Sequence, residues 1–359
     1  MQREGSPVNS KTQSGNFFED FRVGQTLVHA TPRTITEGEV ALYIGLFGAR
    51  FALNSSTPFA QAMGLPRAPI DSLLAFHMVF GKTVADISLN AIANLGYAGG
   101  RFGAPLFPGD TVATDSQVLG LKQNKDGKTG VVYVRSTGLN QRGEMVVEFH
   151  RWVMVRTRDP ARPTPEPVVP TLPAAVPASE LIAPYRVDPA RYDTARAGSP
   201  HLWDDYEAGE RIDHVDGITI EEADHMTGAR LFQNTARVHF NQHVEKEGRF
   251  GRRIVYGGHI ISLARALSFN GLANAQTIAA IHGGRHVNPS FAGDTIYAWS
   301  QVLERQELPG RRDLGALRLR TVAAKDHACS DFPCQDASGA YRPAVVLDFE
   351  YTVLMPRRG

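Results

Sequence analysis

The segment Gln233–Asn241 contains two side chains whose types and spacing suit proton-transfer chemistry. His239 follows Asn234 by five positions and lies upstream of a pair of glycines. An imidazole has an unperturbed pKa of about 6.5, so it can accept or donate a proton near neutral pH. An isolated histidine is more often structural, so His239 becomes a catalytic candidate only with support from elsewhere in the sequence.

A glycine pair precedes an apolar segment in Tyr256-Gly257-Gly258-His259. Glycine lets the backbone turn sharply, and it lets a ligand approach the N–H groups at the positive end of the following helix. Such N–H groups can stabilise a carbonyl oxygen that gains negative charge, for example when a thioester becomes an enolate. The alternative is a plain tight turn before a buried helix.

The elements that must position these residues occur twice in the chain. Residues 99–112 (GGRFGAPLFPGDTV) and 283–296 (GGRHVNPSFAGDTI) are two versions of one motif, and each continues to Ser-Gln-Val-Leu. Gly109 and Gly293 fix the register at 184 positions (293 − 109). Further matches pair 18–25 with 203–210 and 148–155 with 348–355. A period of roughly 180 residues is too long for a solenoid and indicates a duplicated domain.

The two copies differ at the candidate chemical residues. With a local offset of 180 positions (239 − 59), Phe59 corresponds to His239 and Thr57 corresponds to Arg237. Asn234, by contrast, is an asparagine in both copies. A histidine that serves only for packing has no evident reason to occur in one copy alone. We therefore place the chemistry in the second copy.

Each copy predicts the same order of elements, which is a short helix, a loop, an apolar helix and then long alternating strands. The expected helices are 36–47, 72–87, 219–227 and 260–272, and the expected strands include 131–135, 145–155, 317–320 and 345–354. The strands are rich in β-branched and aromatic residues, and Gly-Asp-Thr supplies the turn before one strand of each copy. The fold class is α+β, with a curved antiparallel sheet around one central helix, duplicated.

This pattern divides the chain into four segments. We expect a flexible N-terminus over residues 1–16, a first domain over 17–157, a linker over 158–200 and a second domain over 201–357. The linker contains ten prolines. That density forbids regular helix or internal strand and favours an extended, semi-rigid connector without chemistry of its own.

Composition excludes several classes of protein. The 359 residues are 42% hydrophobic and 21% charged, which is a globular balance and suits two domains. A formal net charge of +1 gives no global attraction to nucleic acid or an anionic membrane. No stretch approaches the ~18 apolar residues of a membrane span. With two cysteines and no apolar signal sequence, we expect a cytoplasmic protein. His327, Cys329 and Cys334 lack the four ligands of a structural zinc site, so no metal is predicted.

The tandem units resemble hotdog domains of the MaoC-type, R-specific enoyl-CoA hydratases. The family motif Gly-Asp-x-Asn-Pro-x-His is matched in part, because His239 occupies the position of the family histidine and Asn234 that of its aspartate. Gly257-Gly258-His259 stands in for the His-Gly turn that opens the central hotdog helix. More narrowly, over roughly residues 15–357 the chain is similar to those members of the family that act on branched dicarboxylyl-CoA thioesters, and the stretches 15–21, 29–37 and 51–60 carry this match.

The resemblance implies reversible addition of water across the double bond of a branched C5 dicarboxylyl-CoA, without a metal or an organic cofactor. In the family, an aspartate and a histidine hold the water and share the acid–base work. Because an asparagine cannot take a proton, we predict that His239 transfers the proton and that Asn234 positions the water. Gly258 and Gly257, with the adjacent His259, are predicted to contact the thioester.

Other charged residues could complete such a site. Asp224 or Asp71 could supply the missing carboxylate or contact the substrate, although Asp71 could equally cap the helix that follows it. Arg237 could bind the free carboxylate of the substrate through its planar guanidinium. Arg252 and Arg253 could bind the phosphates of coenzyme A, and the alternative for them is a solvated charged loop.

The expected molecule is a double-hotdog hydratase with one active site per chain, whose partner is a small acyl-CoA substrate. The first copy would retain a pocket wall. Whole chains are expected to associate as a homo-oligomer, because single hotdog domains pair to complete a shared core. Two rival functions stay open, a hotdog acyl-CoA thioesterase and a non-catalytic acyl-CoA binding module.

Overall fold

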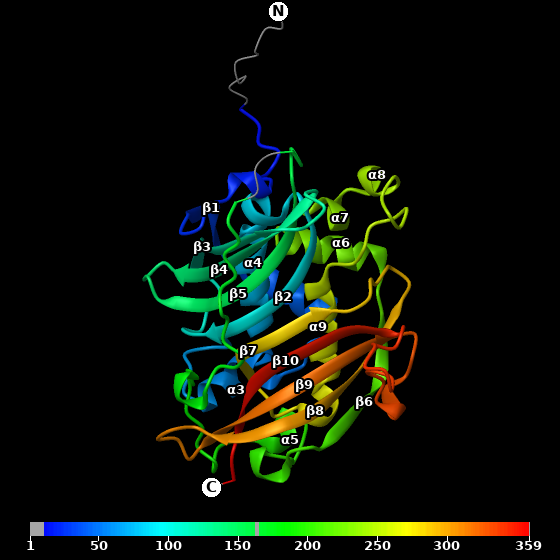
Figure 1. Ribbon diagram of the computed structural model, residues 1–359. Coiled ribbons are helices and arrows are strands. Elements are labelled where there is room, and N and C mark those ends of the chain that lie inside the picture. Colours follow the sequence, from blue (N-terminus) through cyan, green and yellow to red (C-terminus); the bar gives the residue numbers. More distant parts are fainter. Residues whose placement is uncertain (1–10, 162–164, 359) are drawn as a thin grey trace, which may run out of the picture.

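The computed structural model describes residues 11–161 and 165–358 (Figure 1). Most of the N-terminal segment that the sequence predicts to be flexible lies outside this range. Its last residues are held in place, because the Ser14 and Asn16 carbonyls both accept hydrogen bonds from the Asn90 side chain. The Asn16 amide in turn donates to the carbonyl of Asp86.

One antiparallel sheet of ten strands runs through the molecule (Figure 1). Its order is β1-β3-β4-β5-β2-β7-β10-β9-β8-β6, so the second half repeats the arrangement of the first in reverse. The strands are β1 (Thr26–Thr34), β2 (Ala91–Phe102), β3 (Thr111–Gln123), β4 (Thr129–Asn140), β5 (Met145–Arg156), β6 (Arg211–Thr219), β7 (Thr277–His286), β8 (Thr295–Glu307), β9 (Leu314–Lys325) and β10 (Val345–Pro356).

The halves are joined where β2 pairs with β7. Tyr97 lies opposite Gly284, and Gly100 lies opposite Ile281. A Cβ on Gly100 would lie 2.9 Å from the Ile281 Cβ. The repeated Gly-Gly-Arg motif therefore places small residues at the junction, and this lets the two strands approach each other.

Two central helices, α4 (Ser72–Lys82) and α9 (Gly257–Leu267), are enclosed by the curved sheet. Every residue of each helix except the first is buried. The other α-helices are α1 (Glu37–Phe47), α2 (Ala52–Ser55), α3 (Thr57–Ala62), α5 (Thr194–Ala197), α6 (Glu222–Leu231), α7 (Arg237–Phe240), α8 (Gln242–Glu245) and α10 (Phe269–Leu272). This duplicated α+β arrangement confirms the predicted fold class.

The bounds of three predicted helices differ from those observed. The helix expected at 219–227 is α6, which begins at Glu222 because Thr219 still pairs with Thr295 in the sheet. The helix expected from 260 begins at Gly257, so both glycines of the turn belong to its first helical turn. The helix expected to reach residue 87 ends at Lys82, and a π-helical turn follows over Val84–Ser88.

The proline-rich linker packs on both halves. Tyr185 and Val187 are buried in one cluster with Phe59 and Met63. The rings of Phe59 and Tyr192 meet edge to face with centroids 5.4 Å apart. The linker therefore covers the surface of the first half that corresponds to the His239 region of the second.

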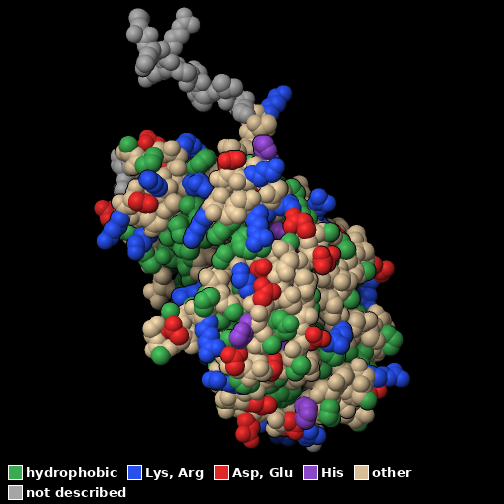
Figure 2. Space-filling model, turned by 90° about the vertical axis from the view of Figure 1, so that its right-hand side faces the viewer, with side chains coloured by type: hydrophobic (Ala, Val, Ile, Leu, Met, Phe, Trp, Pro, Cys, Tyr) green, Lys and Arg blue, Asp and Glu red, His purple; other side chains and the backbone are tan. Residues whose placement is uncertain are grey.

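The face turned to the viewer in Figure 2 carries basic and acidic side chains interspersed with one another. In the described part of the chain, no helix is long and apolar enough to cross a membrane. Because β2 and β7 already pair the two halves within one chain, a single chain completes the core that separate hotdog domains would share. Association of whole chains stays a prediction.

We predict that Gly81→Ala strongly destabilises the protein. A Cβ at Gly81, on α4, would lie 1.6 Å from the backbone carbonyl oxygen of Phe232 in the second half. Overpacking against backbone should lower the free energy of unfolding by about 3 kcal/mol, measured by chemical denaturation. Gly45→Ala, on the exposed face of α1 with nothing within 4 Å, is the matched control and should stabilise the protein by up to ~1 kcal/mol. Equal midpoints for the two variants would contradict this account of the contact between the halves.

Candidate active site

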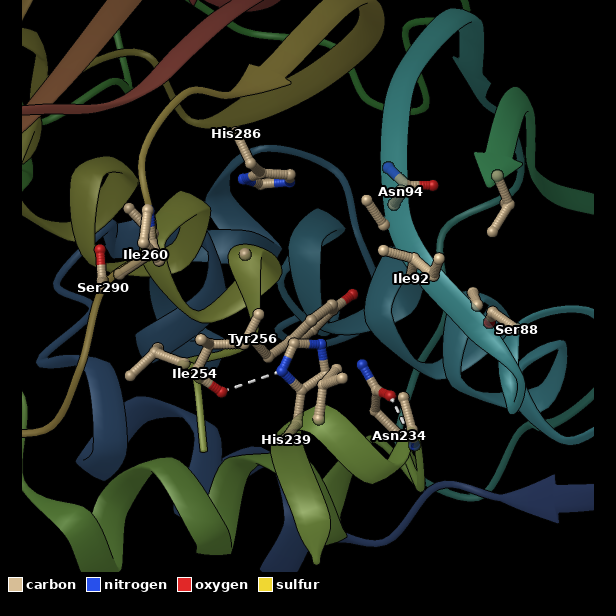
Figure 3. Close-up of a pocket in the computed structure, with 18 of the residues that line it drawn as sticks. Ser88, Ile92, Asn94, Asn234, His239, Ile254, Tyr256, Ile260, His286 and Ser290 are labelled. Atoms are coloured by element: carbon tan, nitrogen blue, oxygen red, sulfur yellow. Dashed lines mark hydrogen bonds between the residues drawn. The ribbon is translucent and has the colours of Figure 1, made fainter. Parts of the chain in front are cut away.

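A cavity of about 270 Å³ lies between the two halves, and Figure 3 shows many of its lining residues. The first half contributes a wall from the end of α4, the start of β2 and the middle of β5. The second half contributes α7, the loop before α9, the first turn of α9 and the chain after β7. The polar lining residues are Ser88, Asn94, Tyr97, Arg151, Asn234, His239, Tyr256, His286, Asn288 and Ser290. No aspartate or glutamate lines this cavity in the described ranges of the chain.

His239 lies on α7, and its ring points into the cavity (Figure 3). Its Nδ1 is 3.0 Å from the carbonyl oxygen of Ile254. Because a carbonyl can only accept, Nδ1 carries the hydrogen, and Nε2 keeps its lone pair. Burial lowers the pKa of His239 to about 4. The ring is therefore an unprotonated base at neutral pH.

Asn234 is buried in the loop between α6 and α7. The preceding residue, Gln233, has φ +56° and accepts a 2.6 Å hydrogen bond from the Lys82 ammonium of the first half. The Asn234 side-chain oxygen accepts from the Ala236 N–H at 3.3 Å. Its amide nitrogen points toward His239 (Figure 3). Both predicted members of the water-binding pair therefore lie together in the cavity.

The corresponding asparagine of the first half is used differently. The Asn54 amide nitrogen donates to the carbonyls of Pro69 and Ile70 at 3.1 and 3.2 Å. Phe59 takes the place of the imidazole and packs on the linker. The first copy of the motif thus has its polar group bonded to backbone, and the cavity beside Asn54 is only about 40 Å³.

The glycine turn lies where the sequence predicts it, at the N-terminus of α9. The first N–H groups of a helix have no partner within the helix, and Gly257 lines the cavity. A Cβ on Gly257 would lie 2.3 Å from the His286 ring, and one on Gly258 would lie 2.4 Å from the Tyr256 ring. Gly258 lies outside the lining. Both positions therefore require glycine on steric grounds, and Gly257 alone presents its backbone to the cavity.

Two residues predicted to contact substrate lie elsewhere. His259 is buried in the interior, with its ring 4.8 Å from Phe47 and 5.9 Å from His225. Burial lowers its pKa to about 3. Asp71 caps α4, where its carboxylate accepts the Leu73 N–H at 2.7 Å. We therefore assign a packing role to His259 and a capping role to Asp71. Asp224 lies in the first turn of α6 and is not part of the lining either.

The three predicted basic residues have different surroundings. The Arg237 guanidinium donates to the Asn90 side-chain oxygen at 2.6 Å and to the Ser14 carbonyl at 3.3 Å, outside the cavity lining. Arg253 forms an ion pair with Glu222, which neutralises its charge. Arg252 is exposed and lies over the ring of Phe291, 3.9 Å from its centroid. Arg252 is thus the member of this set whose charge remains available to a ligand.

His286, the last residue of β7, is a cavity residue that the sequence reasoning missed. Its Nε2 lies 3.2 Å from the Tyr97 hydroxyl, and burial, followed by the nearby His239, lowers its pKa to about 4. The signal was present in the repeated motif, because GGRH in the second copy corresponds to GGRF in the first. In the alignment of the two copies, His286 therefore corresponds to Phe102, as His239 corresponds to Phe59.

Arg151 is the second cavity residue that was missed. It lies on β5 of the first half and is 1% exposed. In the alignment of 148–155 with 348–355, it corresponds to Tyr351. The mismatches between the copies place the candidate residues in the second half with His239, whereas this cation comes from the first half.

We predict that the His239 ring titrates with a pKa of about 4. Because the buried neutral ring resists protonation, its NMR resonances should stay fixed as the pH falls through the ordinary histidine value of about 6.5. A His239→Phe variant, which copies the residue of the first half, assigns the resonance by its loss. A midpoint for His239 near 6.5 would contradict the described environment.

The chain matches the family model described as mesaconyl-CoA hydratase over residues 8–333. It is 73% identical to the β-methylmalyl-CoA dehydratase of Chloroflexus aurantiacus over 98% of this chain and 100% of that one. It is 57% identical to the mesaconyl-CoA hydratase of Cereibacter sphaeroides over 97% of this chain and 100% of that one.

Solved structures agree with these matches. A crystal structure described as a MaoC domain protein dehydratase from Chloroflexus aurantiacus superposes with a TM-score of 0.96, at 73% identity, over 98% of this chain and 100% of that one. A Mycobacterium tuberculosis protein described as having a double hotdog fold gives a TM-score of 0.74 at 27% identity, over 96% of this chain and 99% of that one. The chain belongs to the mesaconyl-CoA hydratase family and has its double-hotdog, MaoC-type fold.

Proposed function

We propose that this cavity catalyses the reversible addition of water to mesaconyl-CoA, which gives β-methylmalyl-CoA. The observation that carries the proposal is the neutral imidazole of His239, fixed through Nδ1 and open at Nε2, beside the amide of Asn234. The names of the two curated relatives, one for each direction of this reaction, supply the substrate. Similarity to both relatives over their full length supports assigning the same substrate to this chain.

The addition begins with a water molecule held between Asn234 and His239. Nε2 of His239 removes a proton as the water oxygen forms a bond to the carbon β to the thioester. The electron pair of the double bond moves toward the thioester oxygen, which becomes an enolate. The protonated His239 then delivers a proton to the α-carbon, so one imidazole serves both transfers. The use of a single acid–base group is consistent with a cavity whose described lining contains no carboxylate.

The enolate oxygen would be stabilised at the N-terminus of α9. The Gly257 N–H and the positive end of the helix favour negative charge there. His286 lies directly against Gly257. In the tautomer whose Nε2 accepts from the Tyr97 hydroxyl, the neutral His286 carries its hydrogen on Nδ1 and would offer a second donor to the same oxygen.

The coenzyme A portion would leave through the side of the cavity lined by Phe250. This exposed ring packs edge to face on Phe291 with centroids 5.6 Å apart. The guanidinium of Arg249 lies over Phe250, and that of Arg252 lies over Phe291. Two exposed guanidinium groups beside a pair of aromatic rings could bind the phosphates and the adenine of coenzyme A.

The proposal is tested with mesaconyl-CoA and purified protein. Hydration removes the absorbance of the conjugated enoyl thioester and releases no free thiol, whereas a thioesterase would release thiol. His239→Ala should lower kcat by about 1000-fold, because the acid–base group is lost. His243→Ala, which removes an exposed histidine of neighbouring α8, is the control and should keep the wild-type rate. Near-normal hydration by His239→Ala would refute the assignment.

We predict a separate effect at the proposed oxyanion site. His286→Phe, which copies Phe102 of the first half, should lower kcat by about 100-fold through loss of one donor. Tyr97→Phe removes the hydroxyl that fixes the His286 ring and should cause a smaller loss in the same direction. Steady-state kinetics with mesaconyl-CoA measure both. An unchanged kcat in His286→Phe would show that the ring takes no part in stabilising the enolate.

A further inference from the structure

We infer that Arg151, contributed by the first half, binds the free carboxylate of the substrate and makes the site specific for dicarboxylyl thioesters. This inference rests on the proposed function and names the group that recognises the acid end of the substrate. It replaces Arg237, whose guanidinium is engaged by Asn90 and Ser14.

Arg151 is a buried cation in the cavity wall. The residue is 1% exposed and belongs to the lining. Its Nη2 donates to the hydroxyls of Thr83 and Ser88 at 2.7 and 3.4 Å. Its guanidinium carbon lies 4.2 Å from the centroid of the Phe80 ring. These contacts fix the plane of the guanidinium before any ligand arrives.

The rest of the guanidinium has no partner. Nε and Nη1 are both buried and make no hydrogen bond within the described residues. No described carboxylate forms an ion pair with Arg151, and the nearby ionisable groups are the hydroxyls of Tyr97 and Tyr256. Burial lowers the pKa of Arg151 to about 10, so the group is still protonated at neutral pH. A buried charge of this kind is costly unless an anion pairs with it.

Nε–H and the N–H groups of Nη1 point in different directions, so each can donate a separate hydrogen bond to an anion. The neighbouring wall has a second unpartnered group, because both polar side-chain atoms of Asn94 are buried without a hydrogen bond. Asn94 lies on β2 opposite Val153, and Tyr97 lies opposite Arg151 in the same strand pair. Arg151 and Asn94 therefore lie on one wall of the cavity, formed by β2 and β5. Asn94 lies across the cavity from His239 (Figure 3).

The chemistry of the reaction gives this cation a defined task. In β-methylmalyl-CoA the new hydroxyl is on the carbon that bears the free carboxylate, so water adds one bond away from that charge. Pairing the carboxylate with a guanidinium fixes the β-carbon in front of the His239 water and reduces the repulsion of the incoming oxygen. A thioester without the carboxylate would leave the cation buried and unpaired, and this penalty discriminates against it.

A purely structural role for Arg151 makes a different prediction about stability. A structural guanidinium would lose stabilising contacts when replaced. An unpaired buried cation, by contrast, can be replaced by an apolar side chain of similar length with no loss of stability, or with a gain. Arg151→Met separates these roles through its melting temperature, which we expect to equal or exceed that of the wild type.

The decisive experiment compares hydration of mesaconyl-CoA with that of crotonyl-CoA, which lacks the carboxylate. We expect the wild type to prefer mesaconyl-CoA, and we expect Arg151→Met to lower kcat/KM for mesaconyl-CoA by about 100-fold through loss of the ion pair. The same variant should keep or improve its rate with crotonyl-CoA. Arg151→Lys should restore part of the preference. Arg156→Met, at the exposed end of the same strand, is the matched control and should keep the wild-type ratio.

The outcomes distinguish failure of the proposed hydratase function from failure of the proposed role of Arg151. A wild type that hydrates neither thioester overturns the proposed function itself. A wild type that hydrates mesaconyl-CoA, with an unchanged preference in Arg151→Met, overturns only the role of Arg151. Loss of the preference in Arg237→Met instead would return the carboxylate site to Arg237.

A measurement on the wild type covers the case in which Arg151→Met does not fold. Succinyl-CoA and butyryl-CoA have no double bond to hydrate, and they differ by the carboxylate. We expect succinyl-CoA to inhibit mesaconyl-CoA hydration at concentrations at least about tenfold lower than those needed with butyryl-CoA. The folded Arg151→Lys variant should reduce that difference. Equal inhibition by the two thioesters would overturn the inference.

Discussion

The pairing of β2 with β7 is the contact on which the cavity depends. It makes one continuous sheet from two repeated halves and places the α4 side of the first half against the α9 side of the second. Tyr97 of β2 thereby meets His286 of β7, and Lys82 reaches the loop that holds Asn234. A single half could form its own sheet and helix, but it would have only one wall of the cavity.

Burial determines the chemical state of the residues at this junction. The imidazoles of His239 and His286 are kept neutral because the cavity disfavours the charged form. Neutrality suits both proposed roles, since His239 would accept a proton and His286 would donate a hydrogen bond without a positive charge beside Arg151. The single fixed charge of the described lining is then the guanidinium. A dicarboxylyl thioester supplies the opposite charge when it binds.

Much of this arrangement could be predicted from the sequence, because the duplication acts as an internal comparison. The strand alternation, the central helices and the Gly-Gly turn are local patterns, and each was located to within a few residues. The mismatch of His239 with Phe59 pointed to a residue that lines the cavity. His286 could have been found in the same way from its mismatch with Phe102.

The remaining members of the site depend on spatial relations that the sequence does not display. Arg237 lies two positions from His239, yet its side chain points to Asn90 and Ser14. Arg151 lies 88 positions before His239 (239 − 151) in the other half, and the two meet only because β2 and β7 pair. Nearness in sequence was therefore a poor guide to which arginine lines the cavity.

The inequality of the halves follows from how such a cavity is built. Each wall comes from a different half, so the duplicated chain has two junctions of this kind and needs only one of them. At the other junction, Asn54 is bonded to backbone, Phe59 packs on Tyr192, and the linker residue Tyr185 is one wall of a cavity of only about 40 Å³. The first half has Phe59 in place of the histidine, yet it supplies Arg151 and Tyr97 to the cavity between the halves. In the proposed mechanism, the second half supplies the acid–base group and the first half supplies the cation that recognises the acid group, a division that two identical domains could not have.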